Sequence, residues 1–505
     1  MFDFLYRLFG RGQRIRQMDH IETDEVFPLH FLDRGTFIRK LVMSYTFQYD
    51  DVLDPQMLHD SLAKLLAIGG WRKLGGRLRL NANGNIELHT PRTFTAERPP
   101  VMFTHLNFDL PIGDHPLASR LPKMAEGISS IHKGYDRFNS LTLPRTLPDD
   151  IHHYLTTDVP LTSLHIVSFT DATLVTISRP HTVTDAMGMA VLIKAWSDVL
   201  AGRLDRVPTL HGTKDDVLES VGTASDKNAQ VPFVLQDKHM KGWTMLVFVI
   251  RFTWDKLTNP RIQPRTVALP ASFVSQLRQN AEREISSNAK PNTPTFFSDG
   301  DLLMAWFCRF IALSRSVDKP ASISYAFDLR GRLDGTIIPG DSYVQNLALT
   351  CFTWLPTPIG SIGEIALSIR QTIARQTTPS QARSLMKLTK DTSEITRHSP
   401  LFGTSNAMFM GASNWTKIGL REAANFAPAV ISSTYKTTAP GAPPVSVTRP
   451  GSCVSYWGGP VGKSTKIFRD FFFIYGKDNS GTYWIEGYLR PETWNLIREE
   501  LEQEV

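Results

Sequence analysis

A predicted strand that leads through a short turn into a predicted helix constrains this chain more than any other stretch. Residues 173–178 (TLVTIS) are rich in β-branched side chains and alternate as a buried strand does. Pro180 ends this pattern, because proline cannot donate to a sheet ladder. Apolar side chains then recur at three- and four-residue steps over 189–200, which predicts a helix with one buried face. His181 lies on the turn between these elements, where its imidazole would be held rigidly.

The spacing of His181 and Asp185 carries little information by itself. Five of the fourteen histidines have an aspartate four positions later. The five pairs are His20/Asp24, His105/Asp109, His132/Asp136, His181/Asp185 and His211/Asp215. Only His181 joins a predicted strand to a predicted helix, so it is the candidate catalytic residue. The alternative is a hydrogen-bonded histidine of the core.

The size and composition of the chain indicate how many domains it has and which kinds of protein it is not. A chain of 505 residues is too long for one core and predicts at least two domains. The three cysteines are far apart and lack metal-ligand spacing, which favours a reduced intracellular protein without a metal centre. The net charge is +6, but the basic residues are scattered, which argues against nucleic-acid binding.

A glycine-rich segment near the C-terminus is similar to a phosphate-binding loop. Residues 458–465 (GGPVGKST) contain its last three residues, Gly462-Lys463-Ser464, but Trp457 stands where its first glycine would be required. The residues that follow are aromatic and predict a strand, whereas a phosphate-binding loop leads into a helix. Binding of a nucleoside triphosphate at this segment is therefore not expected.

Two apolar segments are candidates for contact with a membrane surface. Residues 1–17 and 243–254 both combine aromatic and aliphatic side chains with arginine, and neither is long enough to span a bilayer. The simpler alternative for each is a helix that docks against the chain's own body. We therefore expect a cytoplasmic protein, or one that is peripheral at an intracellular membrane.

The order of predicted elements divides the chain into two similar halves. Residues 1–210 and 266–505 each mix strands with long helices, whereas 211–265 read as a polar connector that contains the apolar segment 243–254. We expect an α+β fold of two domains, each a mixed β-sheet with helices in two layers.

Several short motifs, taken in order, resemble a known family. They are Leu32-Asp33, Gly75-Gly76-Arg77-Leu78, His181-x-x-x-Asp185, Asp328-x-Arg330-x-Arg332-Leu333, Tyr343-Val344-Gln345-Asn346 and Ser413-Asn414-Trp415. Their order resembles the BAHD superfamily, the acyl-CoA-dependent acyltransferases of specialised metabolism, in its fungal form. The match covers nearly the whole chain. It implies two domains like chloramphenicol acetyltransferase, with an active-site tunnel between them.

The sequence departs from the family pattern at two places. The family usually has glycine directly after the motif aspartate, whereas here Ala186 follows it and glycine comes only at Gly188. The second family signature, Asp-Phe-Gly-Trp-Gly, is replaced by residues 425–429 (NFAPA), so that Asn425 starts it and only Phe426 is retained. In the family this signature is largely structural, and its degeneration bears on site detail more than on reaction class.

The resemblance implies transfer of an acyl group, acetyl by default, from acyl-CoA to a hydroxyl of a small secondary metabolite, with no permanently bound cofactor. A neutral imidazole can take the proton of an alcohol, so His181 is the expected general base. Asp185 is expected to pair with Arg330 and to shape the turn; the alternative is that it orients His181 directly. Asn346 is a candidate for oxyanion stabilisation or substrate positioning.

Other readings stay open at this point. Within the superfamily, the acceptor could be an amine, or the acyl donor could be bound to a carrier protein, as in condensation domains. Because the second signature is degenerate, a non-catalytic relative that binds a small molecule is a further alternative. A monomer is expected in each case.

Overall fold

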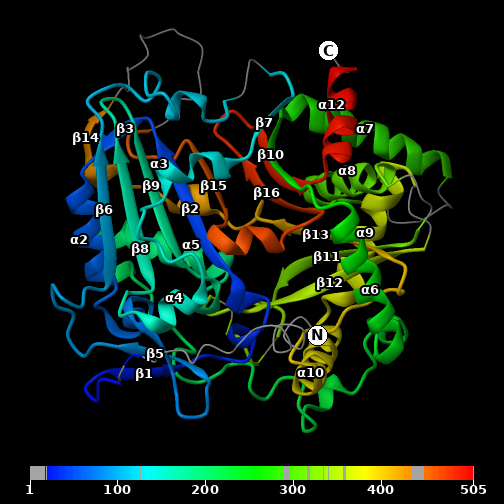
Figure 1. Ribbon diagram of the computed structural model, residues 1–505, viewed down its shortest axis with the longest axis horizontal. Helices are drawn as coiled ribbons and strands as arrows, with labels where there is room; N and C mark the ends of the chain where they lie inside the picture. Colours follow the sequence, from blue (N-terminus) through cyan, green and yellow to red (C-terminus); the bar gives the residue numbers. More distant parts are fainter. Residues whose placement is uncertain are drawn as a thin grey trace.

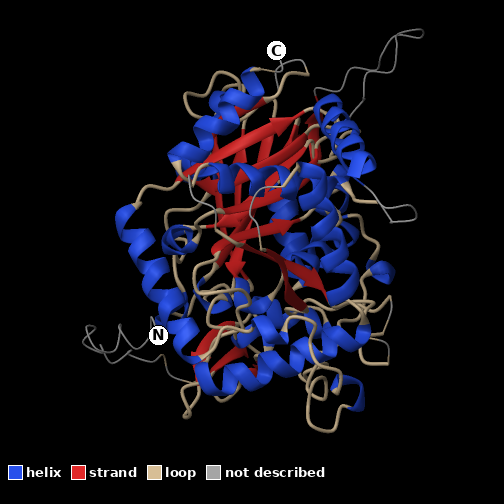
Figure 2. Ribbon diagram, turned by 90° about the vertical axis from the view of Figure 1, so that its right-hand side faces the viewer, coloured by secondary structure: helices blue, strands red, loops and turns tan. Residues whose placement is uncertain are grey.

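The computed structural model describes most of the chain and consists of two large sheets surrounded by helices (Figures 1 and 2). The described residues are 18, 20–123, 127–288, 296–315, 319–333, 335–338, 340–356, 360–433 and 449–503. The predicted mixture of strands and helices is confirmed. The membrane-contact prediction for 1–17 falls outside the described residues.

The first large sheet is built around the strand that precedes His181. Its strands lie in the order β15 (Ser455–Pro460), β2 (Val42–Tyr49), β9 (Thr173–Pro180), β8 (Thr162–Ser168) and β6 (Val101–Asn107). Strand β9 is buried throughout and pairs antiparallel with both β2 and β8. The predicted strand at 173–178 is therefore central in this sheet, which fixes the position of the turn that follows it.

Two helices pack against each other beside this sheet. Helix α5 (Ala186–Leu200) follows the His181 turn, and α2 (Pro55–Leu65) packs against it. The indole of Trp196 on α5 donates to the hydroxyl of Ser61 at 2.9 Å and to the carbonyl of Leu58 at 3.2 Å. These bonds satisfy the only polar atom of a fully buried side chain.

The second large sheet contains strands from both halves of the chain. Their order is β12 (Ala348–Leu355), β11 (Ala321–Asp328), β13 (Met408–Asn414), β16 (Phe471–Lys477), β17 (Tyr483–Leu489), β10 (Gln263–Leu269) and β7 (Ser130–Lys133). Strand β13 runs parallel to both of its neighbours, and the other pairs are antiparallel. The sheet is therefore mixed, as predicted.

The longer helices of the connector and of the second half accompany this sheet. They are α6 (Gly242–Thr258), α7 (Ala271–Asn288), α8 (Asp299–Leu313), α9 (Ile362–Gln376), α10 (Pro379–Thr396) and α12 (Pro491–Glu502). A capping box formed by Ser298 and Asp301 starts α8. Helix α8 is buried on nearly all sides and contacts α7, α9 and α12.

Smaller elements complete the fold. The short strands form a three-stranded sheet of β1 (Glu25–Pro28), β5 (Ile86–Thr90) and β4 (Arg77–Leu80), and a pair of β3 (Asp51–Leu53) with β14 (Val430–Ser433). The short helices are α3 (Asn139–Thr142), α4 (Ile151–Thr156) and α11 (Leu420–Ala423). Of these elements, α3 and α4 lie within 121–160.

Strands are exchanged between the two halves. Strand β7 comes from the first half and joins the second sheet, whereas β15 comes from near the C-terminus and pairs with β2 in the first sheet. The glycine-rich segment at 458–465 therefore begins inside a strand and continues as a 3-10 helix, Gly462–Ile467, which is not the geometry of a phosphate-binding loop. The domain boundaries at 210 and 266 stay a prediction.

Candidate active site

His181 lies at the end of the central strand of the first sheet. It opens a 3-10 turn, His181–Val183, directly after β9. Its backbone N–H donates to the carbonyl of Leu41 at 2.9 Å, and its carbonyl accepts from the side-chain amide of Asn346 at 2.9 Å. Its Nδ1 atom is buried without a hydrogen-bond partner in the described part of the chain, whereas the residue as a whole is partly exposed. The backbone of His181 is therefore held from both sides.

The surroundings of the imidazole favour its neutral form. Burial lowers the pKa of His181 below its ordinary value of 6.5, while the charges of Asp185 and Asp33 and the side chain of Asn346 act in the opposite direction. Burial is the largest of these effects, so the imidazole is neutral at pH 7. This is the form that can accept a proton from a substrate.

Asp185 is the N-cap residue of α5 and is engaged through both carboxylate oxygens. One oxygen accepts from the backbone N–H of Gly188 at 2.7 Å, and the other accepts from the N–H of Leu347 at 2.9 Å. The guanidinium of Arg330 donates to both oxygens, at 3.0 and 3.1 Å. Among the residues that the structure describes, no hydrogen bond joins this carboxylate to the ring of His181. In this geometry Asp185 holds the turn and does not contact the imidazole.

Arg330 joins the end of β11 to the segment that precedes β12. Besides Asp185, its guanidinium donates to Asp328 at 2.7 Å and to the carbonyls of Tyr343 and Gln345 at 3.1 and 2.9 Å. These carbonyls belong to 343–347, the segment that also supplies Asn346 and the N–H of Leu347. One arginine therefore ties the second half of the chain to the start of α5.

The same segment explains why glycine stands at position 188. A Cβ atom added at Gly188 would lie 2.3 Å from the carbonyl oxygen of Val344 and 2.5 Å from the hydroxyl of Thr184. The first turn of α5 therefore approaches the backbone of 343–347 more closely than a side chain permits. In this chain the close contact therefore requires glycine at position 188, whereas Ala186 directly follows the motif aspartate.

Asp33 belongs to the site, although the sequence predicted no role for it. It is fully buried and accepts from the backbone and side-chain amides of Asn346, at 3.0 and 2.7 Å. Its own carbonyl accepts from the hydroxyl of Thr182 at 3.0 Å. The Leu32-Asp33 motif was the signal that could have indicated this role. Because the Asn346 amide donates to both Asp33 and the His181 carbonyl, Asn346 positions the turn in this conformation.

The residues of the degenerate second signature lie in the fold as follows. Phe426 is fully buried and packs against Trp196 of α5 and Tyr49 of β2, with ring centroids 4.4 and 5.5 Å apart. Asn425 is exposed, and its side chain accepts from the N–H of Ala427. Phe426, the one retained residue, therefore packs α5 against β2. Among the described residues, neither Asn425 nor Phe426 contacts His181.

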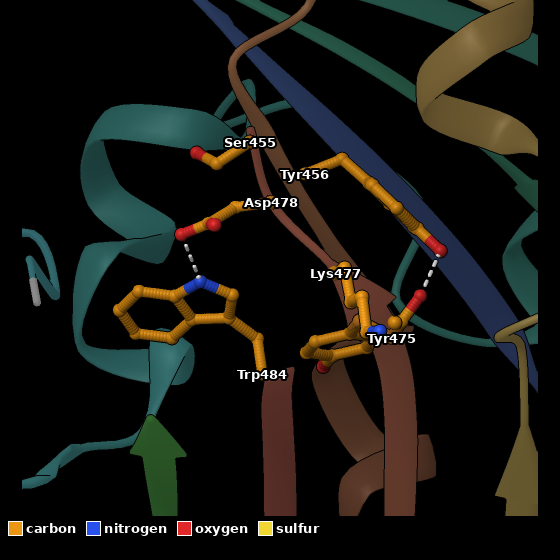
Figure 3. Close-up of a pocket in the computed structure, with 7 residues that line it drawn as sticks. Ser455, Tyr456, Tyr475, Lys477, Asp478 and Trp484 are labelled. Carbon is orange, nitrogen blue, oxygen red and sulfur yellow. Dashed lines mark hydrogen bonds between the residues drawn. The ribbon is translucent and has the colours of Figure 1, made fainter. Parts of the chain in front are cut away.

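A small pocket lies elsewhere, between β15, β16 and β17 (Figure 3). Asp478 accepts from the indole of Trp484 at 2.8 Å, and the hydroxyl of Tyr456 donates to the carbonyl of Tyr475. Its volume is about 10 Å³, enough for about one water molecule. None of its lining residues is a candidate site residue, and it is too small for an organic substrate. Within the described ranges, no group of three or more His, Cys, Asp or Glu side chains could hold a metal ion.

Comparisons with known proteins show the family and the fold of this chain. The model of the Transferase family matches residues 128–424. An acetyltransferase of Botryotinia fuckeliana is 42% identical over 95% of this chain and 90% of its own length. An acetyltransferase of Pyricularia grisea is 37% identical over 97% of this chain and 96% of its own. The fold is similar to that of F. sporotrichioides TRI101, solved with coenzyme A and T-2, with a TM-score of 0.65 at 14% identity over 95% of this chain and 98% of that one.

The two fungal relatives and TRI101 match nearly the whole chain, as the motif order predicted. The low identity to TRI101 shows the fold alone, and that fold is the two-domain acyltransferase architecture that the sequence resemblance implied. The identity to the two fungal relatives shows the family. The chain is thus an acyltransferase that belongs to the Transferase family, among the fungal members of the BAHD superfamily.

Proposed function

We propose that this protein transfers an acyl group, acetyl in the simplest case, from acyl-CoA to a hydroxyl of a secondary metabolite such as a terpenoid, polyketide or alkaloid. The relatives named acetyltransferases and the similarity to a protein solved with coenzyme A and a toxin support this substrate pair. The observation that carries the proposal is that His181 is partly exposed, held through its backbone from two sides and kept neutral by its surroundings.

In the proposed reaction, His181 is the general base. It takes the proton of the acceptor hydroxyl as the oxygen attacks the thioester carbonyl, and the C–O bond forms while the C–S bond of acyl-CoA breaks. The imidazolium then gives this proton to the departing thiolate of CoA. Both substrates meet at one base, so no covalent acyl-enzyme is required. Holding the two reactants together would supply a large share of the rate enhancement.

The remaining candidate residues act as positioning groups in this proposal. Asp185 and Arg330 hold the turn that carries His181. Asp33 accepts from the Asn346 amide and so orients it toward the carbonyl of His181. Asn346 remains our candidate for substrate positioning or for stabilising the oxyanion. To donate to the oxyanion, its side-chain amide would first have to release Asp33 or the His181 carbonyl, the two acceptors that it now has. Asn425 and Phe426 would have no part in the chemistry.

We further propose that the enzyme is a cytoplasmic monomer that associates peripherally with an intracellular membrane. The boundaries 1–210, 211–265 and 266–505 are our proposed division into domains and connector. The apolar connector segment 243–254, now seen as part of helix α6, is the element that supports membrane association.

The experiment that tests the function uses purified protein, labelled acetyl-CoA and a panel of hydroxylated metabolites, with mass analysis of the products. The His181→Ala variant is expected to lose about 10²–10⁴-fold in rate while it remains folded. The matched control is His105→Ala, because His105 has the same spacing to an aspartate but lies exposed on the edge strand β6. Undiminished transfer by His181→Ala would refute the assignment. Acylation of amines only, a requirement for a carrier protein, or binding without turnover would each indicate one of the alternatives.

A further inference from the structure

Helix α6 carries large apolar side chains on its outer face. Trp243, Ile250, Trp254 and Leu257 are 74%, 58%, 67% and 70% exposed. We call these four residues the α6 stripe. Their spacing of seven, four and three positions places them within an arc of roughly 60° on an α-helix. Large apolar side chains that gather in this way mark an interaction surface more often than singly scattered ones do.

The inner face of α6 is already packed against the protein. Phe248 is buried, and its ring lies 5.9 Å from that of Phe409 on β13, centroid to centroid. Asp255 accepts from Arg490 at 2.6 Å, from Arg469 at 3.0 Å and from Arg315 at 3.3 Å. These contacts anchor the helix, so the α6 stripe cannot turn inward without breaking them. A helix that is apolar on both faces is expected to have its second face covered as well.

The charges around the α6 stripe indicate what covers it. Residues 241–258 contain the cations Lys241, Arg251 and Lys256, all exposed, and only one acidic residue, Asp255. Because Asp255 is paired with three arginines, this part of the surface is positive. Tryptophans at two points of an apolar stripe flanked by lysine and arginine are typical of helices that lie in the headgroup region of a membrane.

The dimensions of the helix favour a position on the membrane and not across it. Helix α6 has 17 residues and is therefore about 25 Å long, shorter than the roughly 30 Å of a hydrocarbon core. In the described part of the chain, no helix meets the length and apolarity needed to span a bilayer. The stripe is also one ridge of four residues, whereas a stable protein interface uses about 20–30 residues a side. Figure 1 shows α6 at the outer edge of the molecule.

We propose that α6 is an in-plane anchor that inserts the α6 stripe into the surface of an anionic phospholipid membrane. Lys241, Arg251 and Lys256 contact the headgroups, and the two tryptophans lie at the level of the acyl boundary. This inference rests on the membrane association proposed above and names its element and its lipid chemistry. It is independent of the acyl-transfer chemistry.

The test is sedimentation of the full-length protein with vesicles of phosphatidylcholine alone or mixed with phosphatidylserine. The wild type is expected to bind the mixed vesicles, to bind less at high salt, and to bind phosphatidylcholine at least tenfold more weakly. The triple variant Trp243→Ser, Trp254→Ser, Leu257→Ser is expected to lose at least tenfold in binding. The control is Ile395→Ser on α10, a similarly exposed apolar residue outside the stripe, which is expected to bind as the wild type does.

Several outcomes would overturn the proposal. They are a wild type that binds no vesicles, equal binding by the triple variant, and a wild-type dimer that the triple variant converts to a monomer. Binding that is lost when residues 1–17 are deleted but kept by the triple variant would make that segment the anchor instead. Acetyl transfer to a water-soluble acceptor, measured without vesicles, should be unchanged in the triple variant. Vesicle binding without any transfer activity would contradict the proposed function and leave the α6 anchor standing.

Discussion

Asp185 and Arg330 are 145 positions apart in the chain and form a bidentate ion pair, in which the two terminal nitrogens of the guanidinium donate to the two carboxylate oxygens at 3.0 and 3.1 Å. Both side chains are largely buried, and Arg330 also binds two carbonyls of the segment 343–347. The pair therefore couples the start of α5, where His181 is held, to the second half of the chain. Any change to either partner should affect stability and catalysis together.

We predict that Arg330→Gln lowers the free energy of unfolding by about 3–5 kcal/mol, because it leaves the Asp185 carboxylate buried without its cation. Arg330→Lys should be intermediate, since an ammonium cannot donate to two oxygens in the same planar geometry. Denaturant unfolding measures both. Lys387→Met breaks an exposed pair with Asp391 and should change stability by less than about 1 kcal/mol. Equal effects of Arg330→Gln and Lys387→Met would contradict this account.

Asp33→Asn should reduce kcat by about 10–100-fold and leave KM nearly unchanged. The substitution removes a buried charge that accepts two hydrogen bonds from Asn346, a loss of about 1.5–3 kcal/mol for positioning the His181 carbonyl. Steady-state kinetics and the melting temperature should be measured together. Asp60→Asn, at an exposed position on α2, is the control. A variant that is destabilised but keeps the wild-type kcat at a temperature where it is folded would show that Asp33 has only a structural role.

Gly188→Ala is expected to destabilise the protein by about 1–3 kcal/mol, because the new methyl group would overlap the Val344 carbonyl and displace the backbone of 343–347. The ion pair of Asp185 with Arg330 depends on that backbone, so activity should fall as well. Gly113→Ala is the matched control, since a Cβ there meets nothing within 4 Å. Thermal unfolding that does not distinguish the two variants would argue against the close approach at Gly188.

The pH dependence of kcat/KM should report the imidazole of His181. Because burial lowers the pKa of this histidine below 6.5, the neutral base persists at pH values where an exposed histidine is already protonated. The rate is expected to reach a plateau on the alkaline side and to fall on the acid side, with a midpoint below pH 6.5. Initial rates over roughly pH 5–8 test this. An acid limb whose midpoint lies above pH 6.5 would be inconsistent with the described surroundings of the ring.

Glu486 provides a separate test through stability. Burial raises the pKa of this carboxyl from 4.5 to about 7, although Tyr475 and the N–H of Tyr135 donate to it. Between these two values the folded state holds a proton that the unfolded state has released, so stability is highest at low pH and falls as pH rises toward 7. The fall is at most about 3 kcal/mol. Glu486→Gln should remove it, as measured by denaturant unfolding at pH 4.5 and pH 8. An unchanged slope in the variant would show that another group causes it.

The sequence by itself determined the local features of the site. The alternation of 173–178 and the helical period of 189–200 predicted β9 and α5, and the aspartate at the helix start is its N-cap. Such signals depend on residues a few positions apart, so they can be read without the fold. The family motifs are also short runs of neighbouring residues, and their order along the chain indicated the family that the comparisons show. The pairing of Asp185 with Arg330 came only from the family resemblance.

Only the tertiary structure decided which distant groups meet. Asp33 and Asn346 are 313 positions apart, and no period or spacing predicts that the Asn346 amide donates to both Asp33 and the carbonyl of His181. The same holds for β15, which crosses into the first sheet, and for the contact that requires Gly188. For the apolar run 243–254 the sequence left two readings, contact with a membrane surface and the simpler one of a helix docked against the chain's own body. Which side chains of α6 face outward depends on where Asp255 and Phe248 find their partners, because the packing of one face leaves the other to solvent.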